Sequence, residues 1–561
     1  MQRRNSVSKI VPAVSIGNHV RCRSHRKSEH DRRGSPKGTY EQGRDRQHLA
    51  SLYAAIDDFI TRYNANPSTE RRRTIFLFPG GMGSQLMRAT TDSSGGRSFF
   101  YDVIWLNCSS LTGAATKLRM QGSVDYQKHY ILPHGCVDFL TLRPYEDFTR
   151  WCENNALDLF VFGWDWRRDL TDTVRFFLDT FLPAFERRTD QCRPKPLDDF
   201  TLVGHSFGGL VVKLILNESS NKYVRKMRRA MTVGSPLYGY GGQVHRYFKG
   251  DSDFNRFYRP TTVTEIISTC PGGYELMFLD EETFDANKTA FEHDPGGYDL
   301  KCYPSLDASS GERADPYNPV PGQPRRRKAG LVRYISNHKF DWQLLKAALP
   351  VRKRVASKLS NTVAAKFHNI RGVQFANGAD VAGTVVSQAW RLVPPTFDPD
   401  RDTDPLVDHT GPGDAVIPAW SARLVSLPDD QVITVRLKGD DEHMTMMNSS
   451  PVQTAIWKLL GFSVTAMKRL RAPTKMPAAT RADLNKFLDG LDALSLVNQL
   501  PTQRTDLLRD YLQKFPPERL QQFLNRAYLD LLKSPSQKNG PSPRPGRRRT
   551  AKKPKRSTKR R

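Results

Sequence analysis

The stretch from residue 200 to residue 209 constrains the fold of this chain more than any other. It holds the pentapeptide Gly204-His205-Ser206-Phe207-Gly208, which follows a strand-like apolar run and precedes a helical pattern with one apolar face. A G-x-S-x-G sequence in this setting is typical of a sharp turn that projects the serine from the end of a sheet. The alternative is a glycine-rich turn whose serine only caps the next helix. The strand before the motif disfavours that alternative.

Short apolar runs recur along the chain and alternate with helical patterns. The runs that we interpret as buried strands are 74–78, 157–162, 200–203, 230–233, 372–375 and 432–437. Continuous apolar runs separated by helices are typical of a parallel sheet that helices cover on both faces. Together with the turn at Ser206, this alternation predicts an α/β class protein with the α/β-hydrolase fold and a mostly parallel sheet.

The 561 residues are enough for one large domain with appendages. We expect the α/β-hydrolase domain at 49–462. Within it, the aromatic and basic stretch 239–275 is interpreted as a cap or lid insertion, and the Pro-, Gly- and Ser-rich stretch 304–329 as an exposed loop. Apolar residues at helical spacing predict a C-terminal helical appendage at 463–533.

Most of the positive charge lies near the two ends of the chain. Residues 1–49 carry +8 and residues 534–561 carry +12, out of a formal net charge of +28. We predict a disordered basic arm at 1–48 and a disordered basic tail at 534–561. Simple solvation is the first interpretation of this charge. The second interpretation is attraction to an anionic membrane surface, and the third is binding to nucleic acid. No obligate protein partner is indicated.

The length of the apolar runs and the pattern of cysteines indicate the cellular compartment of the protein. No run of about 18 apolar residues is present, so we predict no transmembrane helix. The segment 10–20 is too short and too interrupted for a convincing signal peptide. Seven widely spaced cysteines without a C-x-x-C pair favour reduced thiols over a disulfide framework or a zinc site. We therefore expect a cytoplasmic protein, able to lie peripheral to a membrane, with no metal and no cofactor.

A serine nucleophile needs a histidine base and a carboxylate that orients the histidine. In α/β-hydrolases the chain order is Ser, then Asp or Glu, then His. Asp414 lies in a glycine-rich turn, and His443 directly follows the strand-like run 432–437. We therefore predict the triad Ser206, Asp414 and His443. An ordinary turn aspartate and a surface histidine are the plain alternatives for the last two. The rival acids and bases are Asp404, Asp408, His409 and His338.

Two backbone amides are predicted to stabilise the oxyanion. One is the N–H of Phe207, directly after the serine, and the other is the N–H of Gly81 in the turn that ends the first core strand. For Gly81 the alternative is a plain turn. The candidates for the substrate pocket are Met82, Trp105 and Trp164. Aromatic residues beside core strands more often pack in the core.

Several motifs occur in a definite order between residues 72 and 462. They are F-P-G-G-M-G-S-Q-L at 78–86, I-W-L-N at 104–107, G-W-D-W-R at 163–167, G-H-S-F-G-G at 204–209, V-G-S-P at 233–236, Y-E-L at 274–276 and G-D-A-V-I-P at 413–418, followed by His443. This ordered set resembles the lecithin:cholesterol acyltransferase-like family of the α/β-hydrolase superfamily, with its lysosomal phospholipase A2 and phospholipid:diacylglycerol acyltransferase branches. The chain departs from the family at Trp164, where the family has Tyr, and at Ala415, where it has Gly.

The resemblance implies that Ser206, Asp414 and His443 form the triad and that Gly81 and Phe207 supply the oxyanion amides. It implies an enzyme that takes an acyl chain from a glycerophospholipid-like ester and passes it to an alcohol or water, without metal or cofactor. The residues alone support an acyl-enzyme formed from an ester. We expect a serine-dependent lipid O-acyltransferase or acyl hydrolase. The alternatives are another esterase or depolymerase on the same fold, and a non-catalytic module that binds membrane or nucleic acid through its basic tails.

Overall fold

The architecture comes from a computed structural model of the chain. It describes residues 36–66, 73–91, 99–105, 118–120, 130–137, 144–239, 242–249, 260–277, 287, 306–307, 312–313, 341–381, 383–390, 406–439 and 441–467. The predicted tail 534–561 lies outside these residues. Of the predicted appendage 463–533, only 463–467 are described, with a 3-10 turn at Val464–Ala466 (η7). These two predictions therefore stay predictions.

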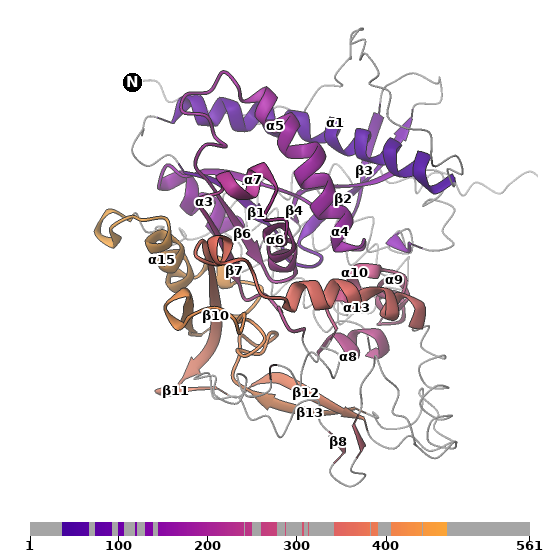
Figure 1. Cartoon of the computed structure of the whole chain (residues 1–561). Helices are drawn as coiled ribbons and strands as arrows, with labels where there is room; N and C mark the ends of the chain where they lie inside the picture. The colour runs from indigo at the N-terminus through magenta and orange to yellow at the C-terminus, as the bar shows by residue number, and fades with distance from the viewer. Residues whose placement is uncertain are drawn as a thin grey trace, which may run out of the picture.

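Among the described residues, the main sheet has seven strands. Its parallel members are β1 (Thr74–Phe78), β5 (Asp158–Val161), β6 (Phe200–His205), β7 (Arg229–Val233), β10 (Phe367–Ala376) and β14 (Val432–Leu437). They lie in the order β5-β1-β6-β7-β10-β14, and the short β11 (Ala379–Asp380) pairs antiparallel with β10 (Figure 1). This sheet confirms the predicted α/β-hydrolase fold. Its order places β6, the strand before Ser206, between β1 and β7.

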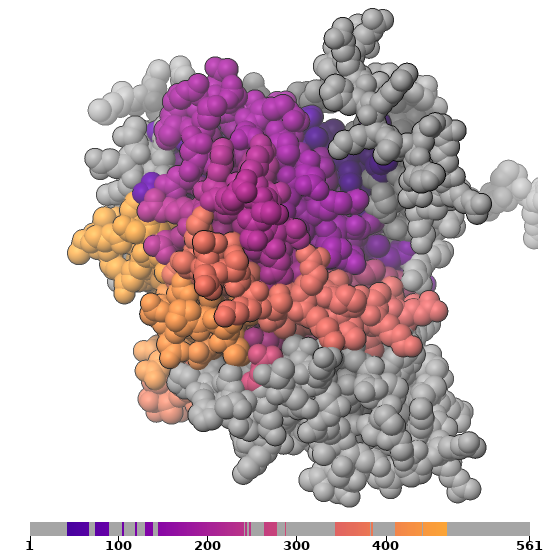
Figure 2. Space-filling view, in the orientation of Figure 1, coloured from indigo at the N-terminus to yellow at the C-terminus, as the bar shows by residue number. Residues whose placement is uncertain are grey.

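Alternate residues of β1 face two separate cores. Phe76 and Phe78 belong to one core, and Ile75 and Leu77 to the other, because successive side chains of a strand point to opposite faces. The first core is covered by α1 (Pro36–Ala65), α5 (Leu182–Arg188), α6 (Phe207–Asn217) and α13 (Trp342–Ala356), and the second by α3 (Glu146–Asn154) and α15 (Ser450–Leu459). Helices thus cover both faces of the sheet, and on the face seen in Figure 2 the residues of α13 (salmon) lie directly against those of segment 144–239 (magenta).

Two smaller sheets were not predicted. One consists of β2 (Ser84–Thr91), β3 (Phe99–Trp105) and β4 (Tyr130–Cys136), and the other of β8 (Leu306–Asp307), β9 (Glu312–Arg313), β12 (Thr384–Trp390) and β13 (Leu406–Gly411). The strands β8 and β9 fall within the stretch 304–329 that was expected to be a loop, and the rest of that stretch lies outside the described residues. Further short helices among the described residues are α4 (Leu170–Arg175), the π-helix η3 (Phe176–Phe181), α7 (Lys222–Lys226), α14 (Asn361–Ala364), η5 (Asp429–Gln431) and η6 (Met446–Asn448).

The N-terminal helix corrects the predicted arm. Residues 36–48, expected to be disordered, form the first turns of α1. Arg44 and His48 are each only 7% exposed, and the His48 imidazole stacks on the Phe176 ring with their centroids 4.3 Å apart. Taken alone, a run of mixed charge indicates a solvated chain. The partners that bury Arg44 and His48 lie more than a hundred residues away in the sequence, so a local pattern could not reveal them.

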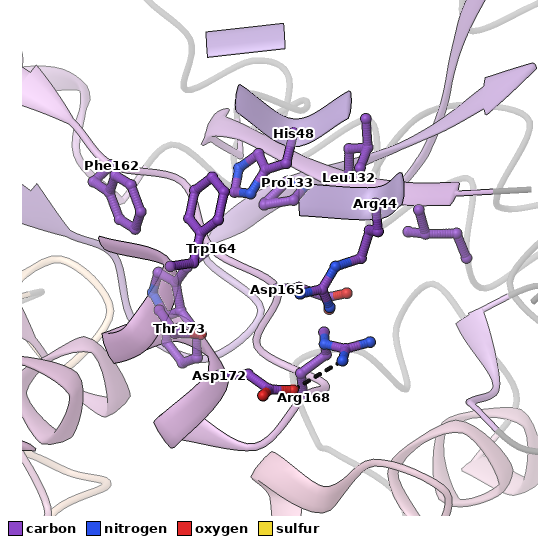
Figure 3. A pocket seen from close by; sticks show the side chains of 12 residues that line it. Arg44, His48, Leu132, Pro133, Phe162, Trp164, Asp165, Arg168, Asp172 and Thr173 are labelled. Atoms are coloured by element: carbon purple, nitrogen blue, oxygen red, sulfur yellow. Dashed lines mark hydrogen bonds and ion pairs between the residues drawn. The ribbon is translucent and has the colours of Figure 1, made fainter. Parts of the chain in front are cut away.

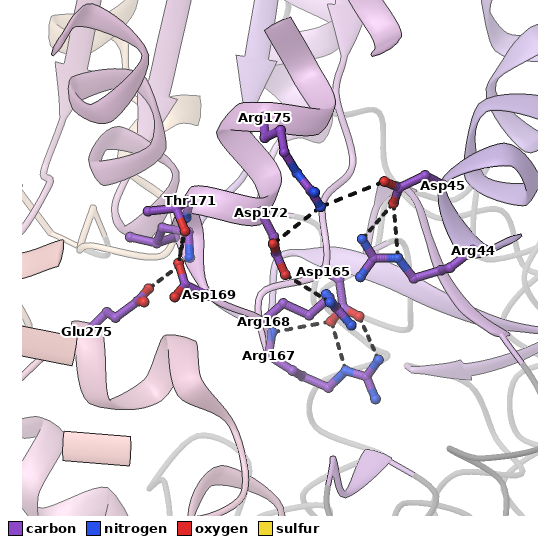
Figure 4. A network of polar contacts seen from close by, with 11 residues as sticks. Arg44, Asp45, Asp165, Arg167, Arg168, Asp169, Thr171, Asp172, Arg175 and Glu275 are labelled. Atoms are coloured by element: carbon purple, nitrogen blue, oxygen red, sulfur yellow. Dashed lines mark hydrogen bonds and ion pairs between the residues drawn. The ribbon is translucent and has the colours of Figure 1, made fainter. Parts of the chain in front are cut away.

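Ion pairs and a small cavity join the start of α1 to the loop after β5. The pairs are Arg44–Asp45 at 2.7 Å, Arg175–Asp45 at 3.9 Å, Arg175–Asp172 at 3.4 Å and Arg168–Asp172 at 2.8 Å (Figure 4). Figure 3 shows His48 and Arg44 on one side of the cavity, facing Trp164 and Asp165. Burial, and then the charge of Arg44, lowers the pKa of His48 to about 3, so its ring is neutral.

Three helices belong to the predicted lid region, namely α8 (Gly242–Lys249), α9 (Pro260–Ile267) and α10 (Pro271–Glu275). Residues 240–241 and 250–259 lie outside the described residues, so the role of this region as a cap or lid stays a prediction. The start of α10 packs on the elbow. A Cβ added to Gly272 would lie 2.5 Å from the Trp166 carbonyl oxygen and 3.3 Å from Cε1 of Phe207.

Glu275, the last residue of α10, is a buried carboxyl that is held protonated. It is 1% exposed, accepts a hydrogen bond at 3.0 Å from the Leu170 amide, and shares a side-chain hydrogen bond with Asp169 (Figure 4). Burial and the nearby charge of Asp169 raise the pKa of Glu275 well above its ordinary value, and Arg352 opposes them only in part. A protonated Glu275 can donate to the Asp169 carboxylate, which ties α10 to the start of α4.

This pair predicts how stability depends on pH. The raised pKa means that, above about pH 4.5, folding takes up a proton that the unfolded chain lacks, so the free energy of unfolding falls as the pH rises toward the folded pKa. Glu275→Gln keeps a donor for Asp169 without an ionisable proton. We expect this variant to be more stable than the wild type at pH 8 and to show a flatter profile, measured by urea unfolding between about pH 5 and pH 9.

The exposed Glu218, which pairs with Arg354 at 2.7 Å, provides the matched control. Glu218→Gln should change stability by no more than about 0.5 kcal/mol at either pH. A Glu275→Gln variant that is less stable than the wild type at pH 8 would show that Glu275 is ionised in the folded protein.

Candidate active site

Ser206 lies at a strained turn between β6 and α6. Its backbone has φ 53° and ψ −126°, in a region that residues with a side chain rarely adopt. The turn depends on close backbone packing, since a Cβ added to Gly208 would lie 2.2 Å from the Phe78 carbonyl oxygen, and one added to Gly204 would lie 2.5 Å from Cα of Gly209. The Ser206 amide donates to Val233 O at 2.9 Å. These contacts aim the side chain away from the sheet, as in a nucleophile elbow.

The three residues predicted as a triad lie in one hydrogen-bonded row. Ser206 Oγ is 2.8 Å from His443 Nε2, and His443 Nδ1 is 2.8 Å from Asp414 Oδ2. Asp414 is 1% exposed and His443 3%, while Ser206 is partly exposed. The row therefore has a buried acid end and a serine end within reach of a substrate.

Backbone contacts hold the acid and the base together. Asp414 Oδ1 accepts from the amides of Val416 at 3.1 Å and Ile417 at 2.7 Å, and the His443 amide donates to Asp414 O at 2.8 Å. Gly234, at φ +55°, leaves room for the pair, because a Cβ there would lie 2.8 Å from Asp414 Oδ2. Both Asp414 oxygens thus accept hydrogen bonds, which fixes the orientation of the carboxyl group.

The turn after Asp414 explains one departure from the family pattern. Ala415, where the family has glycine, has φ 80°, a left-handed conformation that glycine adopts at little cost. Its amide donates to Thr384 Oγ1 at 3.0 Å, and a β-bridge joins Gly413 to Pro418 across the turn. The alanine therefore keeps the backbone shape that places Asp414, held by contacts with β12.

The structure describes two of the four rivals for the acid and base. Asp408 and His409 lie on β13, opposite Gln388 and Ser387 of β12, whereas Asp404 and His338 lie outside the described residues.

The loop after β1 contacts the elbow directly. A Cβ added to Gly81 would lie 3.3 Å from Cδ1 of Phe207 and 3.5 Å from its Cβ, so the two predicted oxyanion residues are neighbours. The turn closes with a hydrogen bond from the Gly83 amide to Gly80 O at 3.0 Å, and Met82 has φ 61°. Within the described residues, no hydrogen bond is assigned to the amide of Gly81 or Phe207. Among these residues, both N–H groups therefore keep their capacity to donate.

The two tryptophans predicted to line the pocket hold this loop instead. The indole of Trp164 donates to Pro79 O and that of Trp105 to Met82 O, both at 2.8 Å. Trp105 is 2% exposed and Trp164 1%, which leaves almost no surface for a substrate, so we correct their role to supports of the loop. Met82 is partly exposed and stays a pocket candidate. Trp164 also meets the Phe207 ring edge to face, with centroids 5.0 Å apart.

The D-W-R element is a buried ion pair. Arg167, 1% exposed, donates to both oxygens of Asp165 at 2.8 and 2.6 Å, and to Leu118 O at 3.1 Å. Burial raises the pKa of Asp165, but the charge and hydrogen bonds of Arg167 and the charges of Arg168 and Arg44 together outweigh it and leave the pKa below its ordinary value. With both partners satisfied, the pair serves the structure of the loop that carries Trp164.

Two residues beside the triad were not predicted. His205 lies inside the pentapeptide, and Tyr145 precedes α3; the two are hydrogen-bonded to each other. The position of His205 next to Ser206 in the pentapeptide could have indicated it from the sequence, whereas Tyr145 belongs to no motif. Among the described residues, no cluster of three His, Cys, Asp or Glu side chains could hold a metal ion. Over the same residues, no helix is both long and apolar enough to span a membrane.

No protein-family model matches this chain, and no curated protein matches it. A solved structure described as "The crystal structure of Tle4-Tli4 complex" is similar, with a TM-score of 0.43 and 12% sequence identity. The match covers 70% of this chain and 99% of that one.

Proposed function

We propose that this chain is a serine-dependent acyl hydrolase or O-acyltransferase of lipid esters, and that Ser206 carries the acyl group. The observation that supports it most is the row of atoms from Ser206 Oγ through His443 to Asp414 Oδ2, with both contacts at 2.8 Å. Since a carboxylate only accepts, the hydrogen of His443 lies on Nδ1. The lone pair on Nε2 then faces the serine hydroxyl, which is the tautomer that a general base needs.

The chemistry follows from this geometry. Ser206 Oγ attacks the carbonyl carbon of the ester while its proton passes to His443 Nε2, and the oxyanion lies against the amides of Gly81 and Phe207. The ester C–O bond then breaks, and His443 gives the proton to the departing alcohol oxygen. Water or an acceptor alcohol next attacks the acyl-serine, losing its proton to His443. The proton finally returns to Ser206 as the product leaves.

The choice of a glycerophospholipid-like donor rests on the ordered motifs of residues 72–462, which resemble a family that acts on such esters. The basic ends of the chain suggest how the protein reaches this substrate. Their combined charge of +20 would be attracted to a surface of anionic lipids, with about 1 kcal/mol from each residue near that surface. We therefore take an anionic membrane as the partner of the tails, ahead of nucleic acid.

Trapping the acyl-enzyme tests the proposal. Full-length protein is mixed with diacyl glycerophosphocholine vesicles, with or without anionic lipid, and quenched in acid. Peptide mass mapping should find one fatty acyl group on Ser206, with more of it on anionic vesicles. A second sample with a long-chain alcohol separates transfer from hydrolysis, because transfer yields the acyl ester of that alcohol and hydrolysis yields free fatty acid.

The outcomes decide between the candidates. Turnover of short p-nitrophenyl esters without turnover of phospholipid would favour the other esterase on this fold. If neither substrate is turned over and a fluorophosphonate does not label the protein, the alternative of a non-catalytic module that binds through its tails is favoured. An acyl group on another residue would move the nucleophile.

A further inference from the structure

A chain of three hydrogen bonds connects the loop after β1 to the backbone of His443. The Gly80 amide lies 2.5 Å from Tyr145 Oη, Tyr145 Oη lies 2.8 Å from His205 Nδ1, and His205 Nε2 lies 3.0 Å from the carbonyl oxygen of His443. The connected residues come from four distant parts of the sequence. One end is the loop that carries Gly81, and the other end is the backbone of the residue proposed as general base.

The chemistry of the groups fixes the direction of every bond. The His443 carbonyl can only accept, so Nε2 of His205 carries the hydrogen. In a neutral imidazole, Nδ1 then has only a lone pair, and Tyr145 must donate its hydroxyl hydrogen to it. The Tyr145 oxygen is left to accept from the Gly80 amide. With His205 neutral, all three bonds are satisfied in this one arrangement.

The surroundings keep both side chains neutral. His205 and Tyr145 are each 2% exposed. Burial, followed by the charge of His443, lowers the pKa of His205 well below its ordinary value, and burial raises the pKa of Tyr145 well above its own. The tautomer of His205 therefore does not change while His443 gains and loses its proton during a reaction.

The packing around Gly80 leaves little room for a side chain at the loop end of this chain of bonds. A Cβ added to Gly80 would lie 3.3 Å from Tyr145 Oη, 3.4 Å from His205 Nδ1 and 3.0 Å from Cβ of Ser206. The loop, the tyrosine, the histidine and the nucleophile therefore meet around one backbone position. A small shift of this loop would change the distance from the Gly81 amide to the oxyanion.

We propose that Tyr145 and His205 are positioning residues that hold the Gly81 amide at a fixed distance from His443. The oxyanion donor and the general base then keep the same relative position during acyl transfer. This inference rests on the proposed function. Neither residue touches the reacting atoms. Stabilisation of an oxyanion depends on donors that are in place before the charge develops, and a site held too loosely loses much of that benefit.

Tyr145→Phe removes only the hydroxyl and leaves the Gly80 amide and His205 Nδ1 without their partner. We expect kcat for an ester substrate to fall about 10–100-fold, less than the 10²–10³-fold lost when an oxyanion donor is removed. KM should change by no more than about threefold, because ground-state binding does not use the oxyanion contacts. Rates are normalised to active sites titrated with a fluorophosphonate, so that misfolded protein does not count.

Three further measurements separate positioning from a general structural role. A trifluoromethyl ketone, which forms an oxyanion on Ser206, should show a Ki raised by the factor by which kcat/KM falls. His205→Phe loses both the contact with His443 O and the contact with Tyr145, so adding Tyr145→Phe to this variant should cost little more. Tyr63→Phe is the matched control, since Tyr63 is equally buried and donates to Pro194 O at 2.8 Å, far from Ser206.

Additive effects, a raised KM with unchanged kcat, or an unchanged Ki would overturn the positioning role. Its failure differs from failure of the proposed function. If activity is present and depends on Ser206 but tolerates Tyr145→Phe, only the positioning role is lost. If no activity depends on Ser206, the proposed function is lost first.

Discussion

Replacing Ser206 with alanine is expected to lower ester turnover by about 10⁴–10⁶-fold, the range found when the nucleophile of a serine triad is removed. His443 would keep its hydrogen bond to Asp414, and the amides of Gly81 and Phe207 would stay in place. A residual rate above that of water, from the oxyanion donors and binding alone, is therefore expected. Initial rates with p-nitrophenyl and glycerophospholipid esters measure the loss, and fluorophosphonate labelling should disappear.

The strain at Ser206 gives this prediction a second part. A residue with a side chain at φ 53° and ψ −126° costs about 1–3 kcal/mol, and glycine avoids that cost. Ser206→Gly should therefore be as inactive as Ser206→Ala and more stable than it, by about 1 kcal/mol in urea unfolding. Ser357→Ala, which removes a serine hydroxyl bonded to Arg354 O at the end of α13, is the control and should keep full activity. Labelling that survives in Ser206→Ala would place the nucleophile elsewhere.

The parallel sheet was predictable because most of its strands are short apolar runs. The run 74–78 coincides with β1, and 432–437 coincides with β14. The run 372–375 captures only the end of β10, which starts at Phe367. The first residues of β10 include His368, Asn369 and Arg371, which are polar yet buried. Asn369, for example, donates to Thr232 on the neighbouring β7 at 2.6 Å. Local hydropathy cannot reveal such a pairing.

Within the candidate site, the sequence indicated the residues whose spacing follows the order of the strands. Ser206 and His443 directly follow predicted strands, so their approach in space follows from the fold. Asp414 is a harder case, because the residues between β10 and Asp414 include the hairpin of β12 and β13. The structure brings Asp414 back to the end of β10 through a hydrogen bond from the Gln374 amide to Gly413 O at 2.8 Å. Its glycine turn was the only local sign of this.

The supports of the site could not be predicted, since they depend on contacts between distant segments. Trp105 and Trp164 were expected at the substrate, but their indoles bond to carbonyls of the loop after β1. Tyr145 lies 60 residues before His205 in the chain and has no motif that announces it. A sequence pattern can identify a reactive group, whereas the groups that hold it in place are known only once the chain is folded.

The carboxylate of the triad gives the second large effect, through the tautomer of His443. In Asp414→Asn, the amides of Val416 and Ile417, which now donate to Oδ1, would still require an oxygen at that position. The new NH₂ group must then face Nδ1 of His443, where it donates. The ring hydrogen moves to Nε2 and points at Ser206, so His443 can no longer accept the serine proton. We expect kcat to fall about 10⁴-fold.

The fold should survive this change, because asparagine has the shape of aspartate and keeps the two amide contacts that hold the turn. Melting curves for Asp414→Asn and the wild type therefore check that the loss lies in the chemistry, and the rate of fluorophosphonate labelling should fall along with kcat. Asp408→Asn is the matched control, since Asp408 is the rival carboxylate on β13. If Asp408→Asn lowered kcat more than Asp414→Asn, the acid of the triad would have to be reassigned. If neither did, His443 would be oriented without a carboxylate, and its short contact with Asp414 Oδ2 would serve only the turn.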